Sequence, residues 1–538
     1  MKVLKFGGSS VANSNNIKKV VKIVHKAAET EKVAVIVSAF GKTTNKLIEA
    51  ATLAASNDSS YMKRFSEVKE QHDNVVQNLI TTDKKEQVQN RVTTLFKQLE
   101  TLLEGCFLLR EITPKAMATI SGFGELLSSY IISEVVKISN KAVYKDSREL
   151  ITTSNVFDKA QVNFKTTNNN CITYFAENNY KVTVLPGFIA QTESGVATTL
   201  GRGGSDYTAA IYAAALDADE LQIWTDVSGM YTANPSIVRQ AFPIAEISYQ
   251  EAMELSHFGA KVIYPPTIQP VLEKNIPIVI KNTFEPYEEG TLISNTPNNT
   301  APVKGISHIE NITLLTIEGS GMVGVSGTSK RLFETLSNAD INVVLITQAS
   351  SEHSICVAIY EEDTDKAVSA INKTFEVEIE RRKVKPVIVE KDLSIIALVG
   401  DNMRNHQGLS GQMFSALGKN NVNIRAIAQG ASQKNISAVI DSMDAKKGLN
   451  TLHEQFFEEK IKQINLFVSG VGNVGKKFLA QINQQNDYLK EHLKMNIRVV
   501  GLSNSKKMIF NTEGIDLNNW GYALENGQKA SIEDFFIR

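Results

Sequence analysis

The sequence predicts an α/β protein: a parallel-rich sheet covered by helices, two small βαββαβ units and a final glycine-rich strand–turn–helix segment. Three observations support this fold class. Short apolar strands alternate with longer helical stretches up to about residue 280, a repeat of constant offset follows, and a strand near the end runs into GVGNVG. We place the three regions at 1–300, 301–460 and 461–538.

The composition excludes several classes of protein. The chain has 538 residues, with 57 Lys and Arg against 58 Asp and Glu, and its net charge of −1 argues against binding nucleic acid through bulk charge. Its three cysteines form no CxxC pair, which favours a reducing compartment over a disulfide framework. No apolar run approaches the roughly 18 residues of a membrane helix, and no signal peptide precedes the first expected strand. We therefore expect a cytoplasmic protein that binds neither membranes nor nucleic acid.

Strands and helices alternate in the first region, which predicts a mostly parallel sheet because parallel strands need long crossover connections. The expected strands are 3–6, 33–38, 182–186, 221–225 and 277–281. Residues 62–109 are rich in Lys, Gln, Glu and Leu at helical spacing and contain no glycine before Gly105. They predict a helical insertion that forms a lid or a flank of the sheet.

The second region contains an internal repeat of 81 residues. Five residues recur at this offset: Gly319 as Gly400, Phe333 as Phe414, Asn342 as Asn423, Gln348 as Gln429 and Ile355 as Ile436. In the first copy, the expected strands are 312–317, 342–347 and 354–359, and the expected helix is 324–338. In the second copy, the expected strands are 394–399, 423–427 and 435–440, and the expected helix is 408–418. Each copy ends in a further helix. Two such units would place their sheets side by side or face to face.

The third region combines a strand at 464–468, the glycines Gly470, Gly472 and Gly475 in GxGxxG spacing, and a following helix. This order is typical of dinucleotide-binding Rossmann-type domains. No acidic residue ends the next expected strand, at 497–504, so NADP(H) is favoured over strict NAD. Only about 70 residues follow the glycines, which is less than half of a complete domain.

Two strand ends in the first region offer backbone N–H groups to an anion. KFGGSS, residues 5–10, is expected to end a strand and to begin a helix near Val11, with its lysine able to reach the same phosphate. LGRGGSD, residues 200–206, precedes a helix from about Tyr207 and adds an arginine fork for a carboxylate. Each segment alone is also consistent with a plain glycine turn, with Asp206 as a helix N-cap.

Two further segments contain candidate ligand-contacting side chains. WTDVSGMYTANP, residues 224–235, follows an expected strand, where open α/β sheets bind ligands, although it could also be two successive turns. Lys261 follows the helical pattern SYQEAMELSHF, and on its own it would be a solvated surface residue.

Taken in order, KFGGSSV, SGFGELLS, LGRGGSDYTA, WTDVSGMYTANP, SYQEAMELSHFGAKV and VIKNT resemble aspartate kinase of the amino-acid kinase family. The repeat resembles the tandem ACT domains that follow that kinase. LITQASSEHS, AIAQGASQKN and GVGNVG resemble the threonine-sensitive type of bifunctional aspartate kinase–homoserine dehydrogenase. The likeness covers essentially the whole chain. It implies an amino-acid kinase fold, tandem ACT domains and a homoserine dehydrogenase truncated within its NAD(P)-binding segment.

The resemblance implies transfer of the ATP γ-phosphate to the β-carboxylate of L-aspartate, giving 4-phospho-L-aspartate, the first step toward threonine, methionine, isoleucine and lysine. Mg²⁺ is expected to bridge phosphate oxygens, with no dedicated protein metal site. The implied catalytic residues are Lys5, Asp206 and Lys261. The implied ATP-binding residues are Gly7, Gly8, Ser9, Thr225, Asp226, Tyr231 and Lys261, and the implied aspartate-binding residues are Glu125, Arg202 and Ser205.

The resemblance also implies regulation. Asn342, Gln348, Asn423 and Gln429 match positions where bifunctional members bind threonine, so L-threonine is the expected inhibitor. Paired ACT units predict a homo-oligomer, at least a dimer, and a scaffold for dimerisation is the alternative role for the repeat. Homoserine dehydrogenase activity is not expected from this chain by itself.

Three positions depart from the family pattern. Asn234 stands where an acidic residue is common, and Tyr264 and Pro266 stand where the family commonly has HPRT. The arginine lost at Pro266 predicts a looser phosphate or nucleotide contact. Two other functions remain open: another amino-acid kinase, and a catalytically impaired, threonine-sensing regulatory subunit.

Overall fold

The computed structural model describes residues 1–138, 141–157, 159–257, 263–265, 268–298, 301–348, 353–430, 434–458, 462–493, 495–512 and 514–537. The chain divides into two compact units, Met1–Gln455 and Phe456–Arg538. Within the first unit, we call residues 1–298 the sheet region and residues 301–455 the repeat region. No helix in the described ranges is long and apolar enough to cross a membrane.

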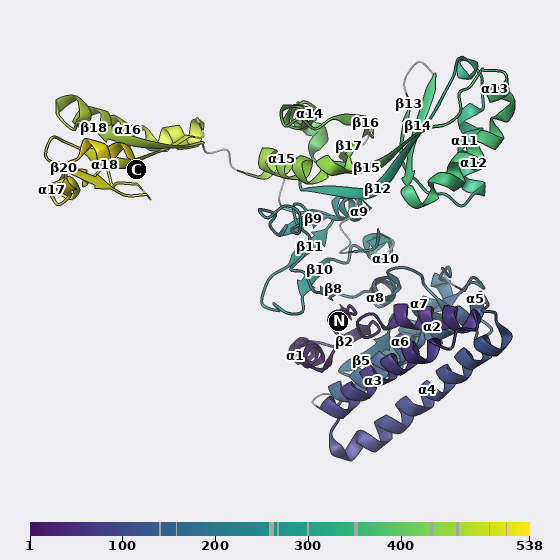
Figure 1. Ribbon diagram of the computed structural model, residues 1–538. Helices are drawn as coiled ribbons and strands as arrows, with labels where there is room; N and C mark the ends of the chain where they lie inside the picture. The colour runs from purple at the N-terminus through teal and green to yellow at the C-terminus, as the bar shows by residue number, and fades with distance from the viewer. Residues whose placement is uncertain are drawn as a thin grey trace. The chain divides into compact units, whose positions relative to one another are not determined.

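The sheet region is built on an eight-stranded sheet (Figure 1). In spatial order its strands are β3 (Ala142–Tyr144), β5 (Val182–Pro186), β2 (Val33–Val37), β1 (Lys2–Phe6), β8 (Glu220–Thr225), β10 (Ile278–Asn282), β11 (Thr291–Ser294) and β9 (Glu246–Ser248). The first six run parallel to one another, and β11 is antiparallel to β10. All five strands expected from the sequence are present. The strands β3, β9 and β11 were not expected, because runs of three or four residues give too short a pattern to identify a strand.

Helices cover both faces of this sheet. They are α1 (Ser14–Thr30), α2 (Thr43–Ala55), α3 (Tyr61–Leu79), α4 (Thr82–Leu109), α5 (Pro114–Ser121), α6 (Phe123–Val136), α7 (Phe164–Glu177), α8 (Gly204–Ala215), α9 (Tyr249–His257) and α10 (Ile268–Glu273). Leu4 and Phe6 of β1 pack toward α1, α2 and α6, whereas Val3 packs in the core on the side of α8. A small sheet of β4 (Thr152–Thr153), β6 (Ile189–Thr192) and β7 (Ala197–Thr199) completes the region.

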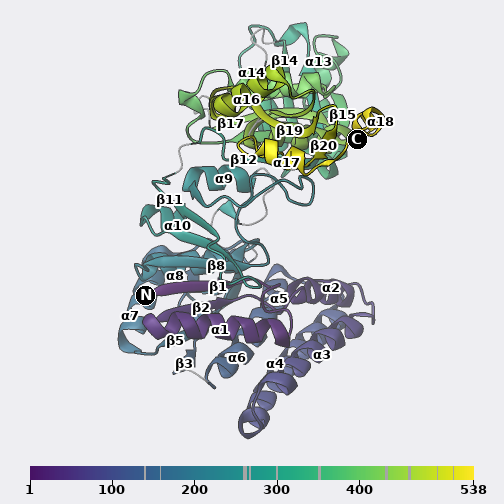
Figure 2. The same cartoon turned by 90° about the vertical axis from the view of Figure 1, so that its left-hand side faces the viewer.

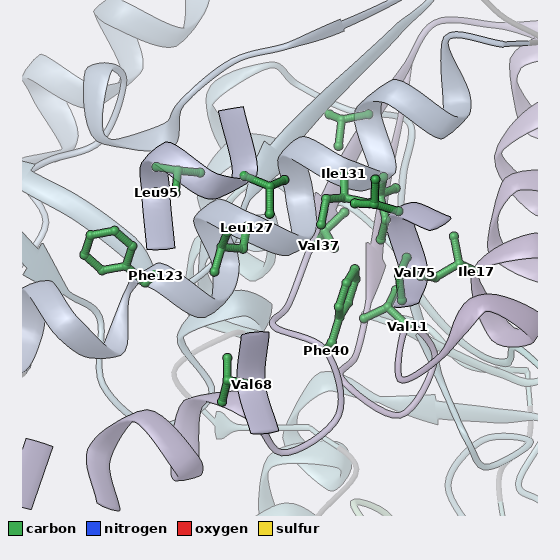
Figure 3. Packing of buried hydrophobic residues seen from close by; sticks show 14 of the residues in the cluster. Val11, Ile17, Val37, Phe40, Val68, Val75, Leu95, Phe123, Leu127 and Ile131 are labelled. Carbon is green, nitrogen blue, oxygen red and sulfur yellow. The ribbon is translucent and has the colours of Figure 1, made fainter. Parts of the chain in front are cut away.

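The helical insertion forms a flank of the sheet. Its helices α3 and α4 lie side by side in both views of the ribbon (Figures 1 and 2). Val68 and Val75 of α3 and Leu95 of α4 share one core with Leu127 and Ile131 of α6 (Figure 3). This burial explains why the insertion is helical over its whole length: its apolar stripe has a core to cover.

The repeat region forms one six-stranded antiparallel sheet in the order β13-β14-β12-β15-β17-β16. Its strands are β12 (Gly305–Glu318), β13 (Val343–Gln348), β14 (Ser354–Tyr360), β15 (Ile388–Val399), β16 (Ile424–Gln429) and β17 (Asn435–Asp441). Its helices are α11 (Thr328–Asn338), α12 (Thr364–Thr374), α13 (Glu376–Glu380), α14 (Leu409–Lys419) and α15 (Ala445–Phe457). The two units therefore lie side by side.

The two long strands β12 and β15 each serve both repeat units. The second half of β12 pairs with the first half of β15, and the first half of β12 pairs with the second half of β15. The first unit thus follows the expected βαββαβ order, with the start of β15 as its fourth strand. The second unit differs, because its fourth strand is the start of β12, which precedes it in the chain. Because β12 and β15 each contribute a strand to both units, the two units share one continuous sheet.

The second compact unit is an open sheet in the order β18-β19-β20-β21 with three helices. Its elements are β18 (Lys462–Ser469), α16 (Asn473–His492), β19 (Met495–Ser503), β20 (Lys507–Phe510), α17 (Trp520–Glu525), β21 (Gln528–Lys529) and α18 (Ile532–Ile537). The strands β18 and β19 are parallel, and α16 connects them. Leu479 and Ile482 of α16 pack against Val499 and Leu502 of β19 in its core.

Candidate active site

A tight turn follows β1. The N–H of Gly7 donates to the carbonyl of Trp224 (3.1 Å), and the hydroxyls of Ser10 and Thr283 lie 2.7 Å apart, which ties the turn to the ends of β8 and β10. A Cβ at Gly8 would lie 2.7 Å from the carbonyl oxygen of Gly41, so only glycine fits there. The turn therefore sits at the carboxyl edge of the sheet, where its backbone is held by neighbouring strands.

The helix after this turn begins later than the sequence indicates. The expected start was near Val11, but α1 begins at Ser14, because the side chain of Asn13 accepts a hydrogen bond from the N–H of Asn16 and caps the helix there. The side-chain amide of Asn16 in turn donates to the carbonyl of Ser9 (2.8 Å). The N–H groups at Gly7, Gly8 and Ser9 thus belong to a separate turn rather than to the first turn of α1.

Lys5 and Asp206 form a nearly buried ion pair. The Nζ of Lys5, on β1, lies 2.5 Å from Oδ1 of Asp206, and Lys5 is 8% exposed. The helix α8 begins at Gly204, with Gly203 as its N-cap in the left-handed region (φ +67°). The expectation that Asp206 is the N-cap is therefore wrong: it lies in the first turn of α8, and its carboxylate contacts Lys5 across the sheet.

Glu125, in the first turn of α6, is a buried carboxyl group with few partners. It is 4% exposed, the N–H of Ala39 donates to its Oε1 at 3.3 Å, and its Oε2 is buried without a hydrogen bond. Burial raises the pKa of Glu125 to about 8, against a smaller opposing effect of the Ala39 N–H. Among the residues that the structure describes, this carboxyl group has no cationic partner.

These residues line one cavity of about 580 Å³ between α6 and α8, which includes Lys5, Glu125, Arg202, Ser205 and Asp206. Its volume suits a small ligand. Arg202 is exposed at the rim, and Ser205 is buried. The cavity has a cation near a helix N-terminus, an exposed guanidinium and a buried carboxyl group, so it can hold a small zwitterion with a further negative charge.

Three of the expected nucleotide contacts lie outside this cavity, beyond the carboxyl end of β8. Thr225 ends β8 and its hydroxyl donates to Oδ1 of the exposed Asp226 (3.1 Å). Tyr231 is partly buried and its backbone forms a bridge with Pro243. Asn234, one of the departures from the family pattern, is exposed and its side chain accepts from Ser236.

Lys261 and Pro266 lie outside the described residues. Tyr264, between them, packs directly on the glycine turn before α8, because a Cβ at Gly203 would lie 2.4 Å from the Cβ of Tyr264. The ring of Tyr264, which departs from the family pattern, therefore occupies space that the absent side chain of Gly203 leaves free.

The four expected regulatory residues lie at equivalent places in the two repeat units. Asn342 and Asn423 are exposed just before β13 and β16, and Gln348 and Gln429 are exposed at the ends of these strands. Ser410, in the first turn of α14, donates to the side-chain carbonyl of Gln429 (3.2 Å). The glutamine of the second unit thus lies beside a helix N-terminus.

The three glycines of GVGNVG have the geometry that a dinucleotide turn needs. Gly470, directly after β18, has φ +96°, Gly472 is the N-cap of α16, and a Cβ at Gly475 would lie 2.2 Å from the carbonyl oxygen of Gly470. Replacement of Gly470 or Gly475 by any other residue would therefore strain or displace the turn. The residues present fit a pyrophosphate at the N-terminus of α16.

Residues 1–282 match the amino acid kinase family, and residues 315–375 and 396–456 each match an ACT domain. The kinase match alone covers more than half of the chain. The chain belongs to the amino acid kinase family. Both ends of the second ACT match lie 81 residues after those of the first, which agrees with the internal repeat. The expected amino-acid kinase fold followed by ACT domains is thus confirmed.

Aspartokinases are among the relatives of this chain. A bifunctional aspartokinase/homoserine dehydrogenase 1 of Arabidopsis thaliana is 36% identical over 99% of this chain, which spans 59% of that relative's length. Aspartokinase 1 of the same plant is 32% identical over 85% of this chain and 80% of its own length. The crystal structure of Escherichia coli aspartokinase III with aspartate and ADP superposes with a TM-score of 0.73 at 28% identity, covering 85% of this chain and all of the other.

Sequence reasoning did not identify two residues that help to build the cavity around Glu125. Ala39 follows β2 and supplies the N–H to Glu125, and Phe188 follows β5 with a left-handed φ of +67° and lines the same cavity. The dipeptide Gly187-Phe188 follows an apolar strand and is a turn signal that could have indicated Phe188. Ala39 offers only its backbone, for which a sequence gives no signal.

Proposed function

We propose that this chain is an aspartate kinase, which transfers the γ-phosphate of ATP to the β-carboxylate of L-aspartate. The observation that supports this most is the buried Lys5–Asp206 pair at the glycine turn, in the same cavity as the buried carboxyl group of Glu125. A phosphoryl acceptor with an ammonium group and two carboxylates matches the charges of that cavity.

In the proposed reaction, an oxygen of the β-carboxylate forms a bond to the γ-phosphorus, and the bond from that phosphorus to the β,γ-bridging oxygen breaks, releasing ADP. Such reactions need positioning and charge stabilisation rather than protein-based covalent chemistry. Lys5 donates to oxygens of the transferred group, and Asp206 holds its ammonium in place. Gly7, Gly8 and Ser9 wrap the phosphates, with the N–H groups of Gly8 and Ser9 directed to them while that of Gly7 donates to Trp224. Thr225, Asp226, Tyr231 and Lys261 contact the nucleotide.

Glu125 binds the ammonium group of aspartate, while Arg202 and Ser205 bind its α-carboxylate. A cation placed against the unpartnered Oε2 of Glu125 lowers the pKa of that carboxyl group, so aspartate binding releases a proton at neutral pH. Mg²⁺, when bound with ATP, neutralises charge on the phosphate oxygens.

A hydroxamate assay tests the proposal, because hydroxylamine traps the acyl phosphate. We expect product with ATP, Mg²⁺ and L-aspartate, and none with glutamate or N-acetylglutamate as the acceptor. Asp206→Asn should lower kcat by about 100-fold with a smaller change in KM, because Lys5 loses its partner. Lys18→Ala, an exposed change on α1, is the matched control. Product with N-acetylglutamate but not with aspartate would instead indicate another amino-acid kinase.

We further propose that L-threonine binds the ACT units through Asn342, Gln348, Asn423 and Gln429, and that it favours a less active arrangement of a homo-oligomer. The equivalent placement of the four residues and the contact between Ser410 and Gln429 support this. Threonine should inhibit the wild-type kinase, and Gln348→Ala with Gln429→Ala should remove that inhibition. Lysine as the only inhibitor would contradict the assignment.

Residues 461–538 are proposed to be the first part of a homoserine dehydrogenase, with NADP(H) at Gly470, Gly472 and Gly475. The turn geometry and Ser503 at the end of β19, where NAD-specific domains carry an acidic residue, support this. The chain by itself is not expected to catalyse the dehydrogenase reaction. NADPH-dependent turnover of aspartate semialdehyde by this chain would contradict that expectation.

A further inference from the structure

A second cavity, of about 510 Å³, lies on the other face of the main sheet. Side chains alternate across a strand, so Lys5 of β1 points to α8, whereas Lys2 of the same strand points to α1. Trp224 of β8 and Lys281 of β10 line the same side as Lys2. The cavity is enclosed by α1 on one side and by the segment 284–287 after β10 on the other. It is therefore separate from the cavity that contains the Lys5–Asp206 pair.

The cavity is rich in positive charge. Five lysines line it: Lys2, Lys19, Lys22, Lys26 and Lys281. Three of them project from one face of α1 at helical spacing, where like charges repel one another. The acidic groups nearby are Glu31, which is shared between Lys2 and the N-terminal amine, Glu220 and Glu289 near Lys281, and Glu285 in the segment 284–287.

Among the described residues, no carboxylate forms an ion pair with Lys19, Lys22, Lys26 or Lys281, and only Lys2 is paired. Burial is the main cause that lowers the pKa of Lys281; Glu220 and Glu289 raise it, and Lys26 and Lys2 lower it by smaller amounts. An excess of positive charge around a concave surface attracts a multivalent anion.

Aromatic rings form the remaining walls. The Nζ atoms of Lys19, Lys26 and Lys281 lie 5.0, 5.4 and 5.6 Å from the ring centroids of Phe284, Tyr287 and Trp224, respectively. Tyr287 is 89% exposed, so its ring is available to a ligand. Rings beside ammonium groups provide a stacking surface for a planar base next to a site for phosphates.

We propose that this cavity binds a nucleoside triphosphate, with its phosphates on the lysines of α1 and its base against the exposed Tyr287. The volume lies within the range of small-molecule sites, and the charge matches a ligand with several negative charges. The site adds to the proposed kinase function, because the phosphates that react are placed at the opposite face of the sheet.

Occupancy of this cavity would act on the kinase site through two connections. Oε2 of Glu285, in the segment that encloses the cavity, accepts from the hydroxyl of Ser228 (2.9 Å) and from the amide of Asn282 (3.2 Å). Ser228 belongs to the turn after β8 that is proposed to contact ATP. On the other side, Asn16 links α1 to the phosphate turn at Ser9.

The test is a fluorescence titration of Trp224 in the full chain, with Trp520→Phe to remove the second tryptophan. GTP is the probe, with Mg²⁺ and aspartate saturating and no ATP analogue present, because an ATP analogue is itself a nucleoside triphosphate and would occupy the same cavity. We expect a saturable change with GTP. Tripolyphosphate and guanosine should each bind at least about tenfold more weakly, because each provides only half of the contacts.

Variants show whether the fluorescence change with GTP comes from this cavity. Lys22→Glu with Lys26→Glu should raise the Kd for GTP by at least about tenfold, and Tyr287→Ala should raise it by a smaller factor. The control is Lys18→Glu with Lys63→Glu, which makes the same change in net charge at exposed positions outside the cavity. Several outcomes would overturn the proposal: no signal with GTP, wild-type affinity in the α1 variant, or tripolyphosphate binding as tightly as GTP. The readout is the binding affinity, and the α1 variants leave the residues of the proposed substrate site unchanged, so the test does not depend on which acceptor the kinase phosphorylates.

Discussion

At the scale of single residues, two buried titratable groups make the sheet region sensitive to pH in opposite directions. Burial raises the pKa of Glu125 to about 8 and lowers the pKa of His72 to about 4. Glu125 lies in the cavity between α6 and α8, whereas His72 of α3 stacks on Phe40 with a centroid distance of 4.7 Å. The penalty of each group builds up across the pH range where the group is charged in the unfolded chain and neutral in the folded one, and it keeps its full value beyond that range.

For Glu125, the folded protein binds a proton that the unfolded chain has released between pH 4.5 and about 8, so the stability falls as pH rises through this range. Glu125→Gln should remove this loss and make the ligand-free protein more stable than wild type by about 3–5 kcal/mol at pH 8.5, with little difference at pH 4.5. Urea unfolding at the two pH values measures the difference in free energy of unfolding between the variant and the wild type. The exposed Glu111→Gln is the control, and an equal gain at both pH values would contradict the argument.

For His72, the unfolded chain binds a proton below pH 6.5 that the folded protein excludes down to about pH 4, so stability falls as pH drops through this range. Its Nε2 is buried without a hydrogen bond, and its ring also meets Phe96 edge-on at 5.7 Å. His72→Phe keeps both ring contacts and should therefore reduce the loss of stability between pH 7 and pH 5 by about 2 kcal/mol. Chemical unfolding at both pH values checks this, and an unchanged pH slope would exclude the assignment.

Residues with a chemical signature could be predicted from the sequence, whereas their supporting partners could not. Lys5, Glu125, Arg202, Ser205 and Asp206 do line one cavity. The N–H of Ala39 and the second basic cavity have no equivalent signal, because backbone donors look alike in a sequence and the second cavity gathers residues from four distant segments.

At the scale of elements, strand positions follow from the sequence more reliably than helix starts. The strand β5 has the expected bounds, whereas α1 begins at Ser14 because Asn13 caps it, and α8 begins at Gly204 because Gly203 adopts a left-handed conformation. A helix start depends on which of several adjacent polar or glycine residues caps it, and that choice is made by tertiary contacts.

Two glycines show how differently elements tolerate a side chain. A Cβ at Gly8 would meet backbone oxygens of Gly41 and Ala39 at 2.7 and 3.2 Å, whereas a Cβ at Gly105, inside α4, would meet no atom within 4 Å. Gly8→Ala should displace the phosphate turn and lower kcat by at least about tenfold. Gly105→Ala should raise the free energy of unfolding by about 1 kcal/mol without altering kcat. Thermal melts and initial rates measure both, and wild-type activity in Gly8→Ala would contradict the role of that turn.

At the scale of the whole molecule, the sheet region and the repeat region share buried polar contacts. The carboxylate of Glu251, in α9, accepts from the N–H of Ser248 (3.0 Å) and from the N–H of Asp401 (2.8 Å), which follows β15 of the second ACT unit. Thr232 and His453 also meet across this contact at 2.9 Å. The helix α9 leads directly to the segment that contains Lys261, so it connects the ACT units to a residue proposed to contact ATP.

Glu251 is 2% exposed, and its removal would leave two N–H groups without their acceptor at this contact. Glu251→Ala should therefore lower the free energy of unfolding by about 2–4 kcal/mol. It should also weaken inhibition by threonine at a concentration that half-inhibits the wild type, because α9 is no longer held to the end of β15. Glu177→Ala, at the exposed end of α7, is the matched control. The coupling role, as distinct from a purely structural one, would be excluded by a variant that is destabilised as expected but keeps the wild-type response to threonine.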